Sequence, residues 1–83
     1  MSQERKYNIL YFGLLADRRG VPEETLESMA HTVEDLYAEL DRKYGLGIDT
    51  RYFRAAVNDE FVYWDHPLLT GDTVAFMPPM SGG

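Results

Sequence analysis

Cysteine is absent from the 83 residues of this chain. A disulfide, a thiolate nucleophile and a cysteine-ligated metal site are therefore all excluded. Histidine is scarce as well, because His31 and His66 are the only two. They lie far apart in the sequence and neither belongs to a spaced ligand motif. We expect both histidines to be structural and no metal to be bound.

Long apolar runs are also absent. No stretch approaches the roughly 20 apolar residues that cross a bilayer, and the N-terminal sequence MSQERKYN lacks the apolar segment of a secretory signal. We therefore expect a cytoplasmic protein with no membrane partner.

Basic residues are few: 8 against 14 acidic ones, for a net charge of −6. Binding of nucleic acid needs a basic face that neutralises phosphates, so we expect no nucleic-acid partner. The negative charge permits docking onto a basic protein, although solubility alone explains it equally well.

What the chain does contain fits one small folded domain. Its residues are 45% hydrophobic and 27% charged, which argues against disorder. The length leaves no room for separate catalytic and substrate domains. We expect a folded body over residues 1–77 and an extended tail over residues 78–83.

Runs rich in β-branched and aromatic residues predict the strands. The first run ends at Gly13 and would place Ile9 and Tyr11 on one face, with Leu10 and Phe12 on the other. Turns are expected between Gly20 and Pro22 and at 58–60. The expected strands span residues 7–13, 25–30, 53–57, 61–63 and 73–77.

A single amphipathic helix is predicted between Thr32, a good N-cap, and Gly45, a natural C-terminal stop. Glu34 and Asp35 place negative charge in its first turn, where the helix dipole favours it. Its apolar stripe is Val33, Leu36, Tyr37, Leu40 and Tyr44. The order β-β-α-β-β-β then predicts an α+β domain with a mixed sheet of four or five strands on one helix. That is the arrangement of the ubiquitin-like β-grasp fold, although periodicity alone does not single out this topology.

The C-terminal residues form an unusual segment. Two prolines favour a stiff, extended exit from the last strand, and two glycines leave the end without side chains. A frayed end would be the ordinary alternative. Fully extended, the segment could project about 20 Å and thread a narrow channel. Its residues are Pro78, Pro79, Met80, Ser81, Gly82 and Gly83.

The terminal carboxylate is the group in this segment that could take part in a reaction. It is an anion at neutral pH and a poor electrophile, so it needs activation, for example by adenylation with ATP. The sequence has no GxxxxGK[ST] phosphate loop, so another protein would have to activate it. An activated carboxyl group could accept sulfur or an amine, and a chain without cysteine could carry sulfur there.

The stretch AAVNDEFVYWDHPLLTGDTVAFMPPMSGG, residues 55–83, closely resembles the small, sulfur-carrying subunit of molybdopterin synthase. The likeness rests on AVN, DHPL, GD.VAF.PP and the terminal GG, and extends more loosely over the first strand and the helix. Family members often have an aromatic residue in place of Met77. His66, Pro67, Gly71 and Asp72 fall inside the motif, and we interpret them as turn residues.

The resemblance implies a β-grasp protein whose C-terminal Gly83 is adenylated by a ubiquitin-activating-type enzyme and converted to a thiocarboxylate. ATP would be used by that enzyme, a separate donor protein would supply sulfur, and no cofactor would stay bound. Two small and two large subunits would assemble, with the tail in the large subunit's active site. Sulfur would pass to cyclic pyranopterin monophosphate and form the dithiolene of molybdopterin. Most catalytic side chains would belong to the large subunit.

The same resemblance implies that Phe12, Phe61 and Met77 contact the partner. Strand alternation supports one of them independently, because Val74 and Phe76 share one face while Ala75 and Met77 share the other. The alternative is that the three are core or isolated surface residues.

Three other functions stay open at this point. The same tail chemistry would serve a protein modifier that joins Gly83 to a lysine, or a sulfur carrier for thiazole synthesis or tRNA thiolation. A β-grasp interaction module with an inert tail is the third.

Overall fold

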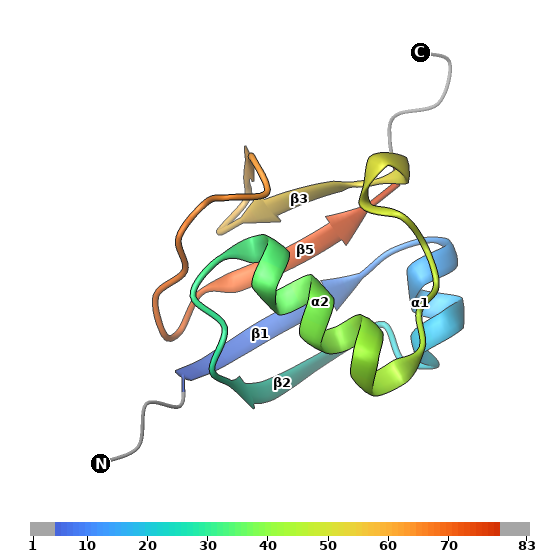
Figure 1. Ribbon diagram of the computed structural model, residues 1–83, viewed down its shortest axis with the longest axis horizontal. Coiled ribbons are helices and arrows are strands. Elements are labelled where there is room, and N and C mark those ends of the chain that lie inside the picture. The colour runs from blue at the N-terminus through green and yellow to red at the C-terminus, as the bar shows by residue number, and fades with distance from the viewer. Residues whose placement is uncertain (1–4, 79–83) are drawn as a thin grey trace.

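The computed structural model describes residues 5–78 and folds them into one five-stranded sheet with one long helix (Figure 1). In chain order the elements are β1 (Arg5–Tyr11), α1 (Leu14–Arg19), β2 (Glu23–Ser28), α2 (Val33–Tyr44), the 3-10 helix η1 (Thr50–Tyr52), β3 (Arg54–Val57), β4 (Glu60–Val62) and β5 (Thr73–Met77).

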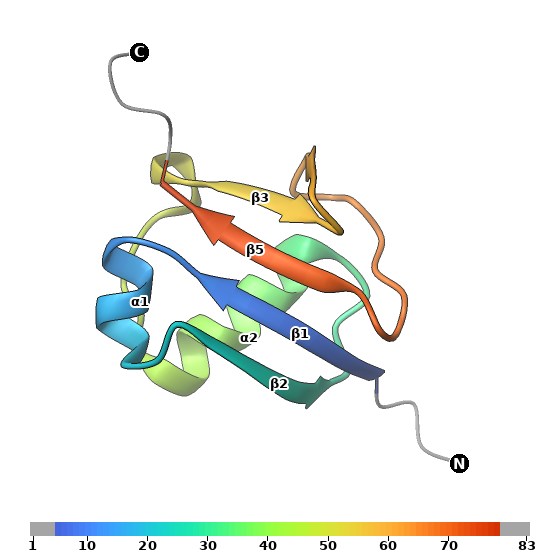
Figure 2. The ribbon, with the colours of Figure 1, turned by 180° about the vertical axis from the view of Figure 1, so that it is seen from behind.

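The strand order across the sheet is β2-β1-β5-β3-β4. β1 pairs antiparallel with β2 and parallel with β5, and β3 pairs antiparallel with both β5 and β4. Helix α2 crosses one face diagonally, and no described helix crosses the other face (Figures 1 and 2). This mixed sheet on one helix is the expected β-grasp arrangement, with the last strand at the centre.

Helix α2 forms where its capping residues predict. The Thr32 hydroxyl accepts a hydrogen bond from the Asp35 backbone N–H at 3.2 Å, and Gly45 ends the helix in the left-handed conformation with φ 65°. Glu34 and Asp35 lie in the first turn, as the helix dipole favours. Local sequence therefore fixes both ends of the helix.

The core lies between α2 and the sheet. Tyr7, Ile9 and Tyr11 of β1 are buried, and Val74 and Phe76 of β5 are fully buried beside them. The expected alternation on both strands is thus confirmed. Polar atoms in the core are paired: the Tyr7 hydroxyl donates to the Ala30 carbonyl oxygen at 2.7 Å. Among the described residues that are not exposed, no buried side-chain nitrogen or oxygen lacks a partner.

The turn predicted after β3 is a tight two-residue hairpin connection. Asn58 and Asp59 have φ of 51° and 72°, as a turn that matches the twist of the strands requires. Val57 and Glu60 pair directly across it. Asn and Asp tolerate this left-handed conformation better than other residues with a side chain, which explains their position.

Two elements were not expected, and the strands expected at 7–13 and 25–30 lie two residues earlier, at Arg5–Tyr11 and Glu23–Ser28. Residues 14–19 form helix α1, where only a connection ending in a turn was expected, and residues 50–52 form η1. Helix α1 is six residues long, too short to give a periodic pattern. It is held by backbone hydrogen bonds at both ends, to the carbonyl oxygen of Gly13 and from the N–H of Gly20, and by one buried side chain, Leu15.

Within residues 5–78, no helix is long and apolar enough to cross a membrane.

Candidate functional site

The tail predicted to carry the function continues from β5, the central strand. β5 has hydrogen-bonded neighbours on both sides, so its end is held more firmly than an edge strand. Pro78 directly follows β5, is exposed, and is the last residue the structure describes. The structure does not describe the other predicted tail residues, Pro79, Met80, Ser81, Gly82 and Gly83. The division into a folded body up to residue 77 and a tail after it therefore stays a prediction.

Phe76 anchors the end of β5. Its side chain is fully buried, and its ring lies 5.6 Å from that of Tyr37, 5.9 Å from Phe53 and 6.1 Å from Trp64, between centroids. Its carbonyl oxygen accepts a hydrogen bond from the Phe12 N–H at 3.2 Å. The strand is therefore fixed in packing and in register two residues before the tail begins.

Gly13 determines how closely the chain after β1 approaches the tail. It has φ 57°, and a Cβ atom there would lie 3.4 Å from Cγ of Pro78. A side chain at this position would be strained by the positive φ, and its Cβ would be in van der Waals contact with the proline ring. Sequence reasoning used Gly13 only as the end of a strand; its contact with Pro78 depends on the parallel pairing of β1 with β5.

The strand register places two of the three predicted contact residues, Phe61 and Met77, on the sheet face away from α2, the face that Figure 2 views. The register places Leu10, Ala75, Ala56 and Phe61 in one row across four strands. The two alanines are buried but belong to no part of the main core, so they form a low floor between the larger side chains. Phe61 is 64% exposed. Met77, two residues along from Ala75, is half-buried opposite Arg54.

The third predicted contact residue, Phe12, comes directly after β1 and is 43% exposed. It lies beside the tail exit, in a hollow that Pro78 also lines. All three predicted residues are therefore accessible to solvent: Phe12 and Met77 near the tail exit, and Phe61 on the edge strand β4, where it also lines the hollow at the start of β5. Their role in partner binding stays a prediction.

A charged cluster fastens α1 to β2 and β1 near this end of the sheet. The Glu24 carboxylate accepts two hydrogen bonds from the Arg19 guanidinium, at 2.8 and 2.7 Å, and one from the Tyr11 hydroxyl at 2.6 Å. The Arg19 guanidinium also lies 3.7 Å from the ring centroid of Tyr44. The hydrogen bonds from Arg19 lower the pKa of Glu24 below its ordinary value, and burial together with Glu24 raises the pKa of Tyr11.

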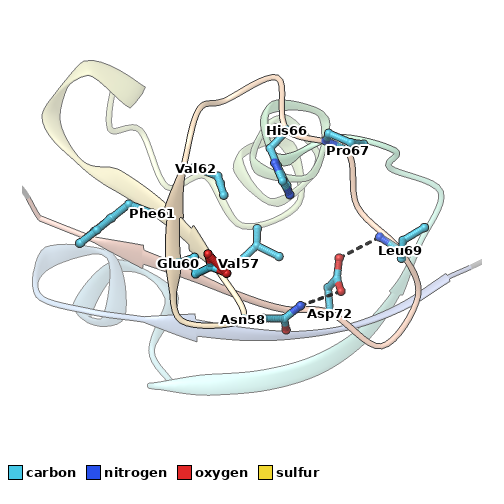
Figure 3. Close-up of a pocket in the computed structure, with 9 residues that line it drawn as sticks. All are labelled: Val57, Asn58, Glu60, Phe61, Val62, His66, Pro67, Leu69 and Asp72. Carbon is cyan, nitrogen blue, oxygen red and sulfur yellow. Dashed lines mark hydrogen bonds between the residues drawn. The ribbon is translucent and has the colours of Figure 1, made fainter.

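At the start of β5, polar side chains hold the turn that precedes the strand (Figure 3). The Asp72 carboxylate accepts hydrogen bonds from the Leu69 N–H at 2.8 Å and from Asn58 Nδ2 at 3.0 Å, and Gly71 has φ 93°. The interpretation of Gly71 and Asp72 as turn residues is therefore confirmed. His66 lines the hollow between this turn and the β3–β4 hairpin.

Neither histidine belongs to a metal-binding group. Over residues 5–78 no set of three or more His, Cys, Asp or Glu side chains could hold a metal ion. His66 takes part in the fold through its backbone, which accepts a hydrogen bond from the Val33 N–H at 3.1 Å.

Residues 9–83 match the family model described as the ThiS family. At the sequence level, the chain is similar to the molybdopterin synthase sulfur carrier subunit of Escherichia coli (strain K12). The two are 37% identical over 79 residues, which cover 90% of this chain and 96% of the relative.

Solved structures of similar proteins show the same fold. A candidate molybdopterin converting factor subunit 1 from Pyrococcus furiosus superposes with a TM-score of 0.77 at 30% identity, covering 92% of this chain and 99% of the other. A complex of subunits 1 and 2 of the molybdopterin-converting factor from Helicobacter pylori contains a chain that superposes with a TM-score of 0.64 at 28% identity, covering 94% of this chain and 99% of that one.

Proposed function

The chain belongs to the ThiS family, and we propose that it is the sulfur carrier subunit of a molybdopterin synthase. The observation that carries this proposal is the 37% identity to the Escherichia coli sulfur carrier subunit over 96% of that protein's length. The likeness spans the folded body and the C-terminal motif together. The similarity therefore supports the function of the whole small subunit, and not only a shared fold.

The tail supplies the reacting group in this proposal. The Gly83 carboxylate attacks the α-phosphate of ATP on an activating enzyme of the ubiquitin-activating type, which gives the acyl adenylate and releases pyrophosphate. A sulfide equivalent from a donor protein then attacks the acyl carbon. The carbon–sulfur bond forms, the carbon–oxygen bond to AMP breaks, and AMP leaves with the thiocarboxylate in place. ATP is thus a substrate of the activating enzyme, and this chain holds no permanent cofactor.

The acceptor is cyclic pyranopterin monophosphate in the large subunit. Each thiocarboxylate sulfur replaces one oxygen substituent of the acceptor and so forms a thioester. Water then cleaves the acyl carbon–sulfur bond, which leaves the sulfur on the pterin and returns the carrier as the carboxylate, ready to be reloaded. A dithiolene contains two sulfur atoms, so one product consumes two loaded carriers. An assembly of two small and two large subunits is also part of the proposal.

The end of the sheet is built for such a donor. Its central strand is anchored by the buried Phe76, and the exposed Pro78 stiffens the first step of the tail. A rigid base with a narrow end can place a terminal carbonyl group against another protein's catalytic side chains. The proposed contacts with that protein are Phe12 at the tail exit and Phe61 and Met77 on the sheet face away from α2, which we call the open face.

A large subunit is the partner that the comparisons support, since a similar chain occurs in the Helicobacter pylori complex of subunits 1 and 2. The activating enzyme and the sulfur donor protein are further proposed partners. Because activation uses ATP, we place the protein in the cytoplasm.

The proposal is tested by a reconstituted sulfur transfer. The protein is loaded with the activating enzyme, ATP and sulfide, then mixed with the large subunit and the pterin precursor, and molybdopterin is measured. A variant with one alanine appended after Gly83 should unfold at the same temperature as the wild type but lose at least about 100-fold in product, since displacement of a reacting group by even 1 Å can cost that much.

Undiminished product from the appended variant would refute the proposal. So would a wild-type protein that forms no molybdopterin but becomes joined to lysine side chains in cell extracts, which would instead indicate a protein modifier.

A further inference from the structure

An apolar hollow of about 200 Å³ lies where the tail leaves the folded body. Its exposed walls come from three separate parts of the chain: Phe12 after β1, Leu14 at the start of α1, and Tyr52 of η1. Pro78 forms a fourth wall. Figure 1 shows α1, η1 and the end of β5 gathered at the same end of the molecule.

Three apolar side chains around this hollow are exposed to solvent, although burial would be more favourable for them. Phe12 is 43%, Leu14 is 54% and Tyr52 is 61% exposed. Single apolar residues on a surface need no explanation, but contiguous apolar patches mark binding sites. Here three of them surround one depression whose floor includes the buried Leu15 and Phe53.

The size of the hollow narrows the choice of occupant. Sites for small molecules and cofactors usually measure about 300–1,000 Å³, so this one is too small for a nucleotide or a pterin. It is suited to one bulky apolar side chain. Interfaces between proteins concentrate their binding energy in such anchors, each seated in a pocket of the partner.

The position of Pro78 indicates which protein supplies that side chain. Gly83 lies five residues after Pro78, and five residues span less than about 20 Å even when fully extended. A protein that takes Gly83 into its active site must therefore come close to the exit of the tail. Because Pro78 is itself a wall of the hollow, a side chain seated there contacts the base of the tail and restricts the direction in which it leaves.

We propose that this hollow accepts a bulky apolar side chain of the large synthase subunit, and that the contact directs the tail into the active site. The inference rests on the proposed function and extends it: the partner would contact α1 and η1 in addition to the open face of the sheet. Leu14 and Tyr52 then become binding residues that the sequence motif does not include.

The test compares Leu14→Asp with Leu69→Asp, a matched control. Leu69 is 71% exposed and lies in the loop before β5, where it lines the hollow at the start of that strand beside Asp72 (Figure 3). Aspartate is compatible with the first turn of a helix, so the fold should survive Leu14→Asp, and Tyr52→Ser provides a second variant from a different element. Circular dichroism and the midpoint of thermal unfolding verify folding of each full-length variant.

The measured quantity is the dissociation constant for the purified large subunit. We expect it to rise about 30-fold for Leu14→Asp and for Tyr52→Ser, in the range of hot-spot residues, and less than about twofold for Leu69→Asp. Sulfur transfer at saturating large subunit should also slow in the first two variants, because the tail is less well directed.

The outcomes separate this inference from the proposed function. If folded Leu14→Asp and Tyr52→Ser bind the large subunit as tightly as the wild type, and the wild type still donates sulfur, the hollow has no such role while the function stands. Weakened binding to the activating enzyme alone would assign the hollow to that enzyme and overturn the proposal. A wild-type protein that neither binds the large subunit nor donates sulfur would contradict the proposed function itself.

Discussion

The two ends of the central strand β5 are built by different means. At its start, polar groups satisfy one another: the Asp72 carboxylate binds the Leu69 N–H and Asn58, and Asn58 Oδ1 accepts the Thr73 N–H at 3.0 Å. At its end, the strand is held by the buried ring of Phe76. Beyond that ring the surface is apolar and incompletely covered.

The hollows at the two ends of β5 differ in size and in the side chains that line them. The hollow at the start of β5 is larger, about 430 Å³ against about 200 Å³ at the tail exit. The carboxylate that borders it, Asp72, already has both oxygens engaged within the fold. At the tail exit, the part of the chain that the structure describes leaves Phe12, Leu14 and Tyr52 exposed, and burial against another protein would stabilise them.

The largest effect on stability is expected at the end of β5. Phe76→Ala removes a fully buried ring that contacts several other aromatic side chains. Such a truncation costs about 3–5 kcal/mol of unfolding free energy, a large fraction of the total for a small domain. Urea denaturation measures it. A loss below about 1 kcal/mol would show that the base of the tail is not anchored by this packing.

Acid should loosen the connection of α1 to the sheet. The pKa of Glu24 is lowered in the folded state, mainly by its hydrogen bonds from Arg19, so the contribution of this carboxylate to stability is present at neutral pH. It is lost as the pH falls below about 4.3, the ordinary value for glutamate, and through the lower value of the folded state.

A Glu24→Gln variant isolates this contribution. It should be about 2 kcal/mol less stable than the wild type at pH 7, as expected for hydrogen bonds to a charged group, and the difference should shrink towards pH 3. Denaturant unfolding at both pH values measures it. A difference that stays constant with pH would mean that the carboxylate charge is not what fastens α1.

The smallest effects on stability are expected from one substitution at each end of β5, and these two substitutions should differ in their effect on binding. Asp72→Ala removes two hydrogen bonds from the turn and should cost about 1–2 kcal/mol without changing affinity for the large subunit. Met77→Asp, half-buried on the open face, should cost no more stability but weaken binding at least about tenfold. Binding titrations with both folded variants measure this contrast. If Asp72→Ala weakened binding and Met77→Asp did not, the large subunit would contact the start of β5 and not its end.

Local signals in the sequence predicted much of this fold. Thr32 and Gly45 marked both ends of α2, and alternation predicted that Val74 and Phe76 face the core. The short helices α1 and η1 were not predicted, because six and three residues are too few for a periodic signal. The parallel pairing of β1 with β5 joins residues far apart in the sequence, so no local pattern specifies it.

The site divides in the same way. The terminal glycines and the motif before them were visible in the sequence, and the resemblance they carry was confirmed by the family match. The contact between Gly13 and Pro78 and the hollow formed by Phe12, Leu14 and Tyr52 were not, because they depend on elements brought together only by the sheet.

The most direct test of the central claim is the intact mass of the untagged protein purified from its own cells. We expect a species in which one oxygen is replaced by sulfur, and fragmentation should place that sulfur on Gly83. If only the plain carboxylate is found while the activating enzyme and a sulfur source are demonstrably present, the protein is not a sulfur carrier.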